Sequence, residues 1–435
     1  MERTERGLFE LYHEDPERAD AIVFGRKSGP DRRGFLKGAG LASMGAVLGS
    51  AIPFSSKMPM GLIPSALADT VEDFRIEAKH ADMILHNDRP VNMETPAHLL
   101  DDDVTPANLH FVRNNGAMPT PIDKAAWRLK IDGEVNEELE LSYDQLTNDF
   151  DQVTLRLQLE CGGNGRAGFN PPPRGNQWTI GAIGNAEWTG VRLRDVLRRA
   201  GLKPSAVYTG HYSYDEHLSG EAGRSSISRG GPIDKMMDPH TLVALKMNGE
   251  DIPAGHGFPA RIVAPGWPGS VSQKWLTRVW VRDKEHDGPG MTGLSYRMPR
   301  YPVEPGAEVP HEDMMVMNSM VVKSVISFPQ AGVEVAAGRP FEVRGQAWAG
   351  DDYVTGMEVS IDFGATWQTA EVMPAPNRYS WQRWRAQIIP PQAGYYEVWA
   401  RATDNRGRSQ PMVVPGWNPR GYLNNACHRI HVQAV

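Results

Sequence analysis

Val153-Thr154-Leu155-Arg156-Leu157-Gln158-Leu159 alternates apolar and polar residues and runs directly into Glu160-Cys161-Gly162-Gly163-Asn164-Gly165-Arg166. The alternation predicts a half-buried strand, so Cys161 is expected at a strand end. The glycines let a bulky group approach the backbone closely, and a nearby cation such as Arg166 favours the thiolate form of a cysteine. A thiolate can bind a soft metal, act as a nucleophile or form half of a disulfide. Because Cys427 is the other of two cysteines in the chain, a disulfide stays open at this point.

The rest of the chain is predicted to be mostly β structure. Its 435 residues include 44 glycines and 34 prolines, a composition typical of a turn-rich fold with many short strands. Trp127–Gly133 alternates like a further strand, and Ser142 is placed to cap a short helix. The clearest helix is expected over Val191–Ala200, with Gly201 as its C-cap. Other helices are expected to be short.

A stiff connector separates this part from a second domain. Pro302, Pro305 and Pro310 fall between residues 301 and 310. Beyond the connector, three stretches alternate with period two and are separated by turn residues, namely Phe341–Gly345, Met357–Ile361 and Tyr396–Ala400. This spacing predicts an immunoglobulin-like β-sandwich.

The first residues are predicted to be an address for export. Arg32-Arg33 precedes a weakly apolar stretch over residues 38–54, and Ala66-Leu67-Ala68 supplies the small residues that a signal peptidase needs. The apolar stretch is too short and too interrupted for a membrane span, which needs roughly 20 apolar residues. A twin-arginine signal and a periplasmic location are therefore expected.

The charge of the chain argues against a nucleic-acid partner. The formal net charge is -7, with acidic and basic residues interspersed. A nucleic-acid binder needs a basic face that replaces condensed counterions. A basic protein partner fits an acidic surface better.

Two further loops resemble, together with the cysteine element, the molybdenum domain of sulfite oxidases. Phe111, Arg113 and Asn114 lie in one polar loop, and Arg174 and Trp178 lie in a proline-rich one. Sulfite oxidases carry a Cys-x-Gly-Asn-x-Arg element followed by a basic residue and a tryptophan before Gly-Ala-Ile. The order and spacing in this chain are similar.

The resemblance continues to the end of the chain. In the family, residues at the positions of His256, Arg261 and Lys274 grip the pterin and its phosphate, and cations at this spacing suit a phosphate. Tyr296 falls where the family carries an active-site tyrosine. Arg420 falls in the closing motif, where a family arginine reaches the substrate.

The resemblance implies a molybdenum cofactor and oxygen transfer to sulfite or a related small sulfur oxyanion. It assigns Cys161 to the metal, and it assigns a catalytic role to Arg113, Arg166 and Tyr296. Substrate-binding residues would be Arg113, Arg174, Trp178 and Arg420, and cofactor-binding residues would be Phe111, Arg113, Asn114, Cys161, His256, Arg261 and Lys274. No Cys-x-x-Cys-His occurs, so no haem is expected and an external c-type cytochrome would accept the electrons.

The expected organisation follows from these motifs. A signal region covers residues 1–68, an irregular lead 69–106, an α+β molybdopterin-binding domain 107–305 and an immunoglobulin-like dimerisation domain 306–435. The last of these implies a homodimer. Asn115 and Cys427 stand where animal sulfite oxidases carry histidine and tryptophan.

Two alternatives remain open on the sequence. One is a sulfane dehydrogenase molybdenum subunit, which has the same fold but acts on carrier-bound sulfur. The other is a secreted β-sandwich protein that binds a partner without catalysis.

Overall fold

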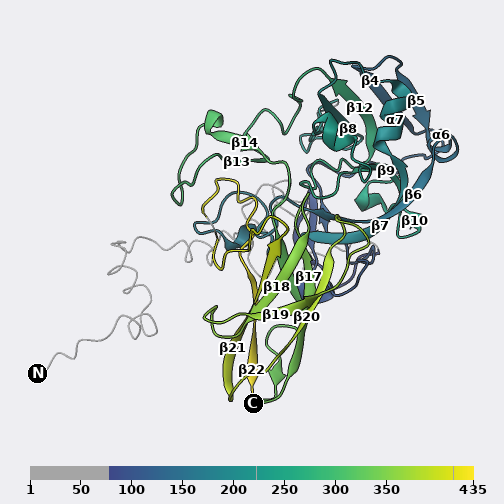
Figure 1. The fold of residues 1–435 in the computed structure, drawn as a ribbon. Coiled ribbons are helices and arrows are strands. Elements are labelled where there is room, and N and C mark those ends of the chain that lie inside the picture. The colour runs from purple at the N-terminus through teal and green to yellow at the C-terminus, as the bar shows by residue number, and fades with distance from the viewer. Residues whose placement is uncertain (1–77, 222, 415) are drawn as a thin grey trace, which may run out of the picture. The chain divides into compact units, whose positions relative to one another are not determined.

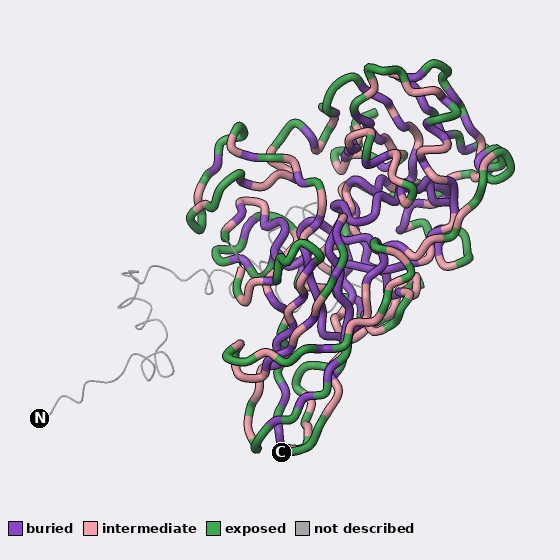
Figure 2. Tube along the Cα trace, in the orientation of Figure 1, coloured by how far each residue is buried: buried purple, intermediate pink, exposed green. Residues whose placement is uncertain are grey.

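The computed structural model describes residues 78–435 except 222 and 415, and the chain is mostly β, as predicted (Figure 1). The twin-arginine region predicted over 1–68 lies outside the described residues. Buried positions gather in the interior of the described part, and exposed positions lie mainly at its periphery (Figure 2). Within 78–435, without 222 and 415, no helix is long and apolar enough to cross a bilayer.

The lead before residue 107 is more ordered than the sequence analysis expected. It contains strands β1 (Ile84–Asp88) and β2 (Val91–Glu94), which pair with each other and then with β3 (Val112–Arg113). A 3-10 helix follows β2 at Ala97–Leu99. All four residues of β2 are buried, including the polar Asn92 and Glu94, and four alternating residues are too few to predict a strand.

Two sheets form the body of the domain that carries Cys161. One has the order β10-β9-β7-β6, with β11 on β9, and its strands are β6 (Gln152–Glu160), β7 (Ile183–Arg192), β9 (Leu242–Met247), β10 (Glu250–Asp251) and β11 (Arg261–Val263). The other has the order β5-β4-β12-β8, and its strands are β4 (Arg128–Gly133), β5 (Leu139–Ser142), β8 (Tyr208–Ser213) and β12 (Leu276–Arg282).

Short helices cover this core. Ser142 caps α6 (Tyr143–Asn148) with a full capping box, as predicted. Helix α7 spans Leu193–Ala200 and ends at Gly201, whereas Val191 and Arg192 still belong to β7. The start of α7 was therefore predicted two residues too early, because the apolar residues of a buried strand continue the apolar face of the helix. In the part of the chain that the structure describes, the remaining helices are a single α turn, α8 (Ile233–Met236), and 3-10 turns at Arg166–Gly168, Ala254–His256 and His311–Asp313.

The C-terminal part is a curled sheet that confirms the predicted immunoglobulin-like domain. After the pair β13 (Arg297–Pro299) and β14 (Met314–Val316), its strands are β15 (Lys323–Phe328), β16 (Glu334–Val335), β17 (Phe341–Trp348), β18 (Val354–Ser360), β19 (Gln368–Val372), β20 (Gln382–Ile388), β21 (Gly394–Asp404) and β22 (His428–Ala434). Strand β19 pairs with β20 on one side and with β18 on the other. The sheet thus folds back on itself and encloses a core around Val343, Trp384 and Val398.

Candidate active site

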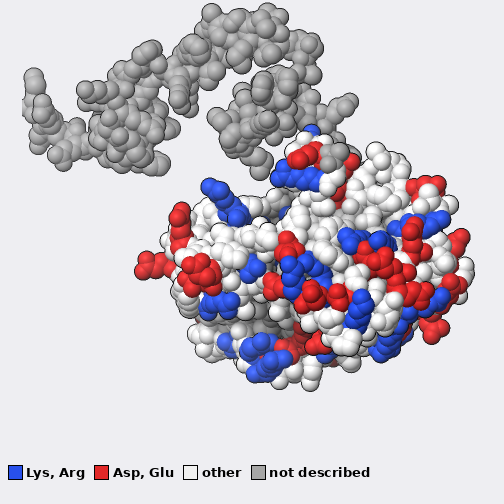
Figure 3. Space-filling model, turned by 90° about the horizontal axis from the view of Figure 1, so that it is seen from above, with Lys and Arg blue, Asp and Glu red and all other residues white. Residues whose placement is uncertain are grey.

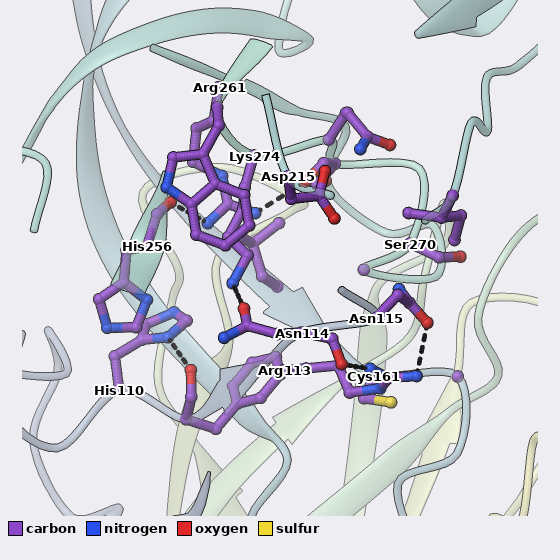
Figure 4. Close-up of a pocket in the computed structure, with 18 of the residues that line it drawn as sticks. His110, Arg113, Asn114, Asn115, Cys161, Asp215, His256, Arg261, Ser270 and Lys274 are labelled. Carbon is purple, nitrogen blue, oxygen red and sulfur yellow. Dashed lines mark hydrogen bonds between the residues drawn. The ribbon is translucent and has the colours of Figure 1, made fainter. Parts of the chain in front are cut away.

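One pocket gathers most of the residues that the sequence analysis selected (Figure 4). The selected residues that line it are Phe111, Arg113, Asn114, Cys161, His256, Arg261, Lys274 and Tyr296. They come from the ends of strands and from the loops between them, which a rigid β scaffold holds in place. Residues as distant in sequence as Phe111 and Tyr296 therefore share one cavity.

Cys161 lies directly after β6, as predicted. Its amide donates to the carbonyl of Ala182 at 2.9 Å, and its own carbonyl accepts from the amide of Asn164 at 2.9 Å. A side chain at Gly163 would collide with the guanidinium of Arg166 and would displace it. Cys161 is a free, buried thiol on the wall of the pocket, and Cys427 is also free.

A buried ion pair supports the residue before the cysteine. The Glu160 carboxylate accepts from Lys323 Nζ at 2.7 Å, from Trp348 Nε1 at 2.8 Å and from Asn164 Nδ2 at 3.1 Å. The side chains of Glu160 and Lys323 are 2% and 1% exposed. Since Lys323 belongs to the C-terminal sheet, this pair connects the cysteine loop to the second domain.

One end of the pocket holds an excess of buried positive charge. Burial and the neighbouring Arg261 hold the pKa of Lys274 well below its usual range, and burial lowers the pKa of Arg261 to about 9. The Arg261 guanidinium donates to the carbonyl of His256 at 2.9 Å, and Lys274 Nζ donates to the carbonyl of Gly255 at 2.8 Å. Such a cluster favours an anion of the phosphate type.

The other end of the pocket is organised by Asn115. Its Oδ1 accepts from the Arg113 guanidinium at 2.7 Å and from the Tyr296 hydroxyl at 3.0 Å. A histidine at this position, as in animal sulfite oxidases, would offer a ring nitrogen in place of an amide oxygen. The departure at Asn115 therefore changes the partner of two predicted catalytic side chains.

Two pocket residues have a strained backbone. Trp275 and Tyr296 adopt φ angles of 48° and 57°, in the left-handed region that bulky residues rarely occupy. Both line the pocket. Strain of this kind is typical of functional sites, where the surrounding packing enforces it.

Four predicted residues do not line this pocket. Trp178 is fully buried in the core next to the cysteine loop, with its ring edge-on to His86 at 4.6 Å between centroids. Arg174 is exposed in its proline-rich loop. Arg166 donates to the backbone carbonyls of Asn176 at 2.8 Å and of Arg420 at 2.9 Å. The closing motif therefore reaches the cysteine loop, although Arg420 itself is not among the pocket residues.

Three residues of the lead hold the site, and the sequence analysis missed them. Lys79 Nζ lies 2.8 Å from His256 Nε2 and donates to the carbonyls of Ala107 and His110 at 2.6 Å each. Burial lowers the pKa of Lys79 to about 7. In the sequence, Lys79 resembles any surface lysine, so no local pattern predicts its buried position beside the pocket.

The other two residues come from β2. Asn92 Oδ1 accepts from the amide of Asn114 at 2.9 Å. The Glu94 carboxylate accepts from the amides of Ile180 and Gly181 at 2.8 and 2.7 Å, which fixes the segment after Trp178. The alternation in Val91-Asn92-Met93-Glu94 was the available signal, but four residues are too few to separate a strand from a loop.

The pocket presents polar atoms that the described residues do not satisfy. Across 78–435, with 222 and 415 left out, Asn114 Nδ2, His110 Nε2, Gln273 Oε1 and Ser270 Oγ are buried without a hydrogen-bond partner. All four residues line the pocket. Buried donors and acceptors are normally paired, so this set fits a ligand with many polar atoms. Together with the cation cluster and the thiol, it fits a pterin cofactor that carries a phosphate and a soft metal.

Comparisons with known proteins agree with this geometry. Residues 115–289 match the oxidoreductase molybdopterin binding domain, and residues 314–435 match the Mo-co oxidoreductase dimerisation domain. The crystal structure of the sulfane dehydrogenase SoxCD from Paracoccus pantotrophus is 25% identical, with a TM-score of 0.65 over 88% of this chain and 96% of that chain.

Curated relatives extend the match. Sulfite oxidase from Gallus gallus is 33% identical over 363 residues, which cover 81% of this chain and 78% of the relative. Mitochondrial sulfite oxidase from Rattus norvegicus is 33% identical over 380 residues, which cover 82% of this chain and 66% of the relative. The pocket and these matches together show that the chain belongs to the sulfite oxidase family of molybdopterin-binding oxidoreductases.

Proposed function

We propose that this protein oxidises sulfite to sulfate with a molybdenum cofactor bound in the pocket of Figure 4. The observation that carries the proposal is a free thiol, Cys161, on the wall of a buried cationic pocket. The relatives named sulfite oxidase support sulfite as the substrate. Membership of an oxidoreductase family contradicts the alternative of a non-catalytic β-sandwich binding protein.

Two sets of residues would hold the two parts of the cofactor. The Cys161 thiolate would bind molybdenum, because thiolates suit soft metals. His256, Arg261 and Lys274 would hold the pterin and its phosphate, and Arg261 would contribute charge-assisted hydrogen bonds. When bound, the cofactor would supply an oxygen atom and take up two electrons.

The remaining pocket residues would handle the substrate. Sulfite is a small dianion, and Arg113 offers it a fixed positive charge in a pocket where the protein replaces part of the screening water. Asn115 orients both Arg113 and the Tyr296 hydroxyl. Arg420 would approach from the closing motif, and Arg166 would support the cysteine loop. Arg174, exposed in its loop, would add positive charge outside the pocket, and Trp178 would support the cysteine loop from the core.

The proposal also covers the electron acceptor, the cellular location and the oligomeric state of the protein. We infer that a c-type cytochrome accepts the electrons, in the periplasm, after twin-arginine export. On the molecular face that Figure 3 shows, acidic and basic side chains are interspersed, which suits a protein partner better than a nucleic acid. The match of residues 314–435 to a dimerisation domain supports a homodimer.

A second candidate is a sulfane dehydrogenase, favoured by the structural match to SoxCD. Purified, molybdenum-loaded protein separates the two with ferricyanide as the electron acceptor. Sulfite-dependent reduction of ferricyanide supports the first function. If ferricyanide is reduced only with a carrier protein that holds bound sulfur, and not with free sulfite, sulfite oxidation is contradicted.

Arg420 supplies a quantitative prediction for sulfite binding. Replacing Arg420 by methionine keeps much of the stem and deletes the charge, so the KM for sulfite is expected to rise by the equivalent of roughly 1.5–3 kcal/mol, the range for a charged hydrogen bond. Steady-state kinetics on folded, molybdenum-loaded protein measures this. Arg339→Met, on an exposed arginine of the same domain, serves as the control. An unchanged KM in Arg420→Met would remove Arg420 from the substrate site.

Lys79 supplies a prediction for cofactor retention. Lys79→Met breaks the contacts to His256, Ala107 and His110, so the pterin end of the pocket is expected to loosen. The molybdenum content per chain after prolonged dialysis should fall below half of the wild-type value. Lys203→Met, on an exposed lysine, should retain its metal. Equal molybdenum in both variants would show that Lys79 is dispensable for the cofactor.

A further inference from the structure

Over the ring of Tyr296 lies an arginine that neither the motifs nor the proposed mechanism use. Arg229 is fully buried, with 0% of its surface exposed, two residues after the pocket residue Ile227. Its backbone carbonyl accepts from the amide of His211 at 2.7 Å, which fixes the segment alongside β8. Counting only the described residues, none of the three guanidinium nitrogens has a hydrogen-bond partner.

The Arg229 side chain lies on the face of the Tyr296 ring. The guanidinium carbon is 4.7 Å from the ring centroid. The Tyr296 ring also stacks on Tyr422, at 5.7 Å between centroids and 17° between planes, and the guanidinium of Arg166 lies 5.2 Å from the Tyr422 ring. Each of the two stacked tyrosines therefore has an arginine over its ring, and the first tyrosine lines the pocket.

Burying the Arg229 charge in this arrangement lowers the stability of the folded chain. A buried charge normally has an opposite charge or a full set of hydrogen bonds, because leaving water costs several kcal/mol. A ring face offsets only part of that cost. Burial lowers the pKa of Arg229, and the nearby Arg297 lowers it further, so its surroundings disfavour the charge. The fold alone gives no reason to place an arginine here.

The charge has a use if an anion enters the pocket. In a site of low polarity a fixed cation attracts an anion over several ångströms, even without contact. The Tyr296 hydroxyl is held by Asn115, which also binds Arg113. The Arg229 charge over the Tyr296 ring would therefore add to the field of Arg113.

We propose that Arg229 is a positioning residue whose buried positive charge, acting through Tyr296, is completed by a small oxyanion in the pocket. This rests on the proposed function for the identity of the anion as sulfite. One substitution should therefore have two effects. Removing the charge should weaken oxyanion binding, and it should not weaken the fold.

The test uses cofactor-loaded Arg229→Met and Arg229→Lys. For Arg229→Met, the KM for sulfite and the inhibition constant for sulfate should each rise about threefold to tenfold, an electrostatic effect without direct contact. The kcat should stay within about twofold, and the thermal midpoint should equal or exceed the wild-type value. Arg229→Lys retains the charge and should recover most of the affinity.

Arg282→Met is the matched control. Arg282 is also buried and lies 4.0 Å over the Trp280 ring, but it is paired with Asp287 at 2.5 Å and lies outside the pocket. Its loss should lower the thermal midpoint and leave both anion constants unchanged. The contrast separates a charge that serves binding from a charge that serves the fold.

Each other outcome overturns the proposal. Unchanged KM and sulfate constants in Arg229→Met would do so. Equal weakening in the methionine and lysine variants would show a loss of shape. A large drop in the midpoint, or failure to fold, would show a structural role. If the wild-type protein does not oxidise sulfite, the proposed function fails separately. In that case sulfate binding tests Arg229 separately. Sulfate should raise the thermal midpoint of the wild-type protein more than that of Arg229→Met.

Discussion

Cys161→Ser is expected to remove nearly all sulfite oxidation while leaving the chain folded. A serine hydroxyl is neutral at working pH, so it cannot replace a thiolate as a donor to a soft metal. The kcat should fall by at least a hundredfold, which corresponds to roughly 2.7 kcal/mol of barrier. Turnover with ferricyanide as the acceptor measures the loss, and molybdenum analysis shows whether the cofactor is still bound.

Cys427→Ser is the control for this substitution. Cys427 is also a buried free thiol, and burial raises its pKa to about 11, so it stays a neutral thiol outside the pocket. Its replacement should leave kcat within twofold of the wild type. If Cys161→Ser retains more than a tenth of wild-type activity, the thiolate is not the metal ligand.

Lys323→Met is expected to cause the largest loss of stability. It leaves the Glu160 carboxylate buried without its cation, and breaking such a pair typically costs about 3–5 kcal/mol. Trp348 and Asn164 still donate to Glu160, but neutral donors do not neutralise the charge. Urea unfolding, followed by tryptophan fluorescence, should show the midpoint move to a lower concentration.

A double variant tests the cause. Glu160→Gln together with Lys323→Met removes both charges and keeps the side-chain shapes, so most of the loss should be recovered. The same pair connects β15 to the cysteine loop, so the single variant should also lower turnover. A free energy of unfolding within 1 kcal/mol of the wild type in Lys323→Met would contradict the pairing seen in the structure.

The sequence by itself determined the elements whose pattern is local. The alternation over 153–159 ends in β6 and places Cys161 after it, and the Ser142 capping box starts α6. Period-two stretches predicted the strands of the C-terminal domain. These signals lie within a few residues of one another, because periodicity and capping depend only on near neighbours.

Only the tertiary structure decided which charged and polar residues meet. Glu160 and Lys323 are 163 residues apart, and Lys79 and His256 are 177 apart. The sequence assigned the lead to an irregular segment, yet its residues hold Asn114, His256 and the loop after Trp178. Arg229 carries no motif at all. Burial removes these side chains from water, and each then depends on a distant partner that no local pattern encodes.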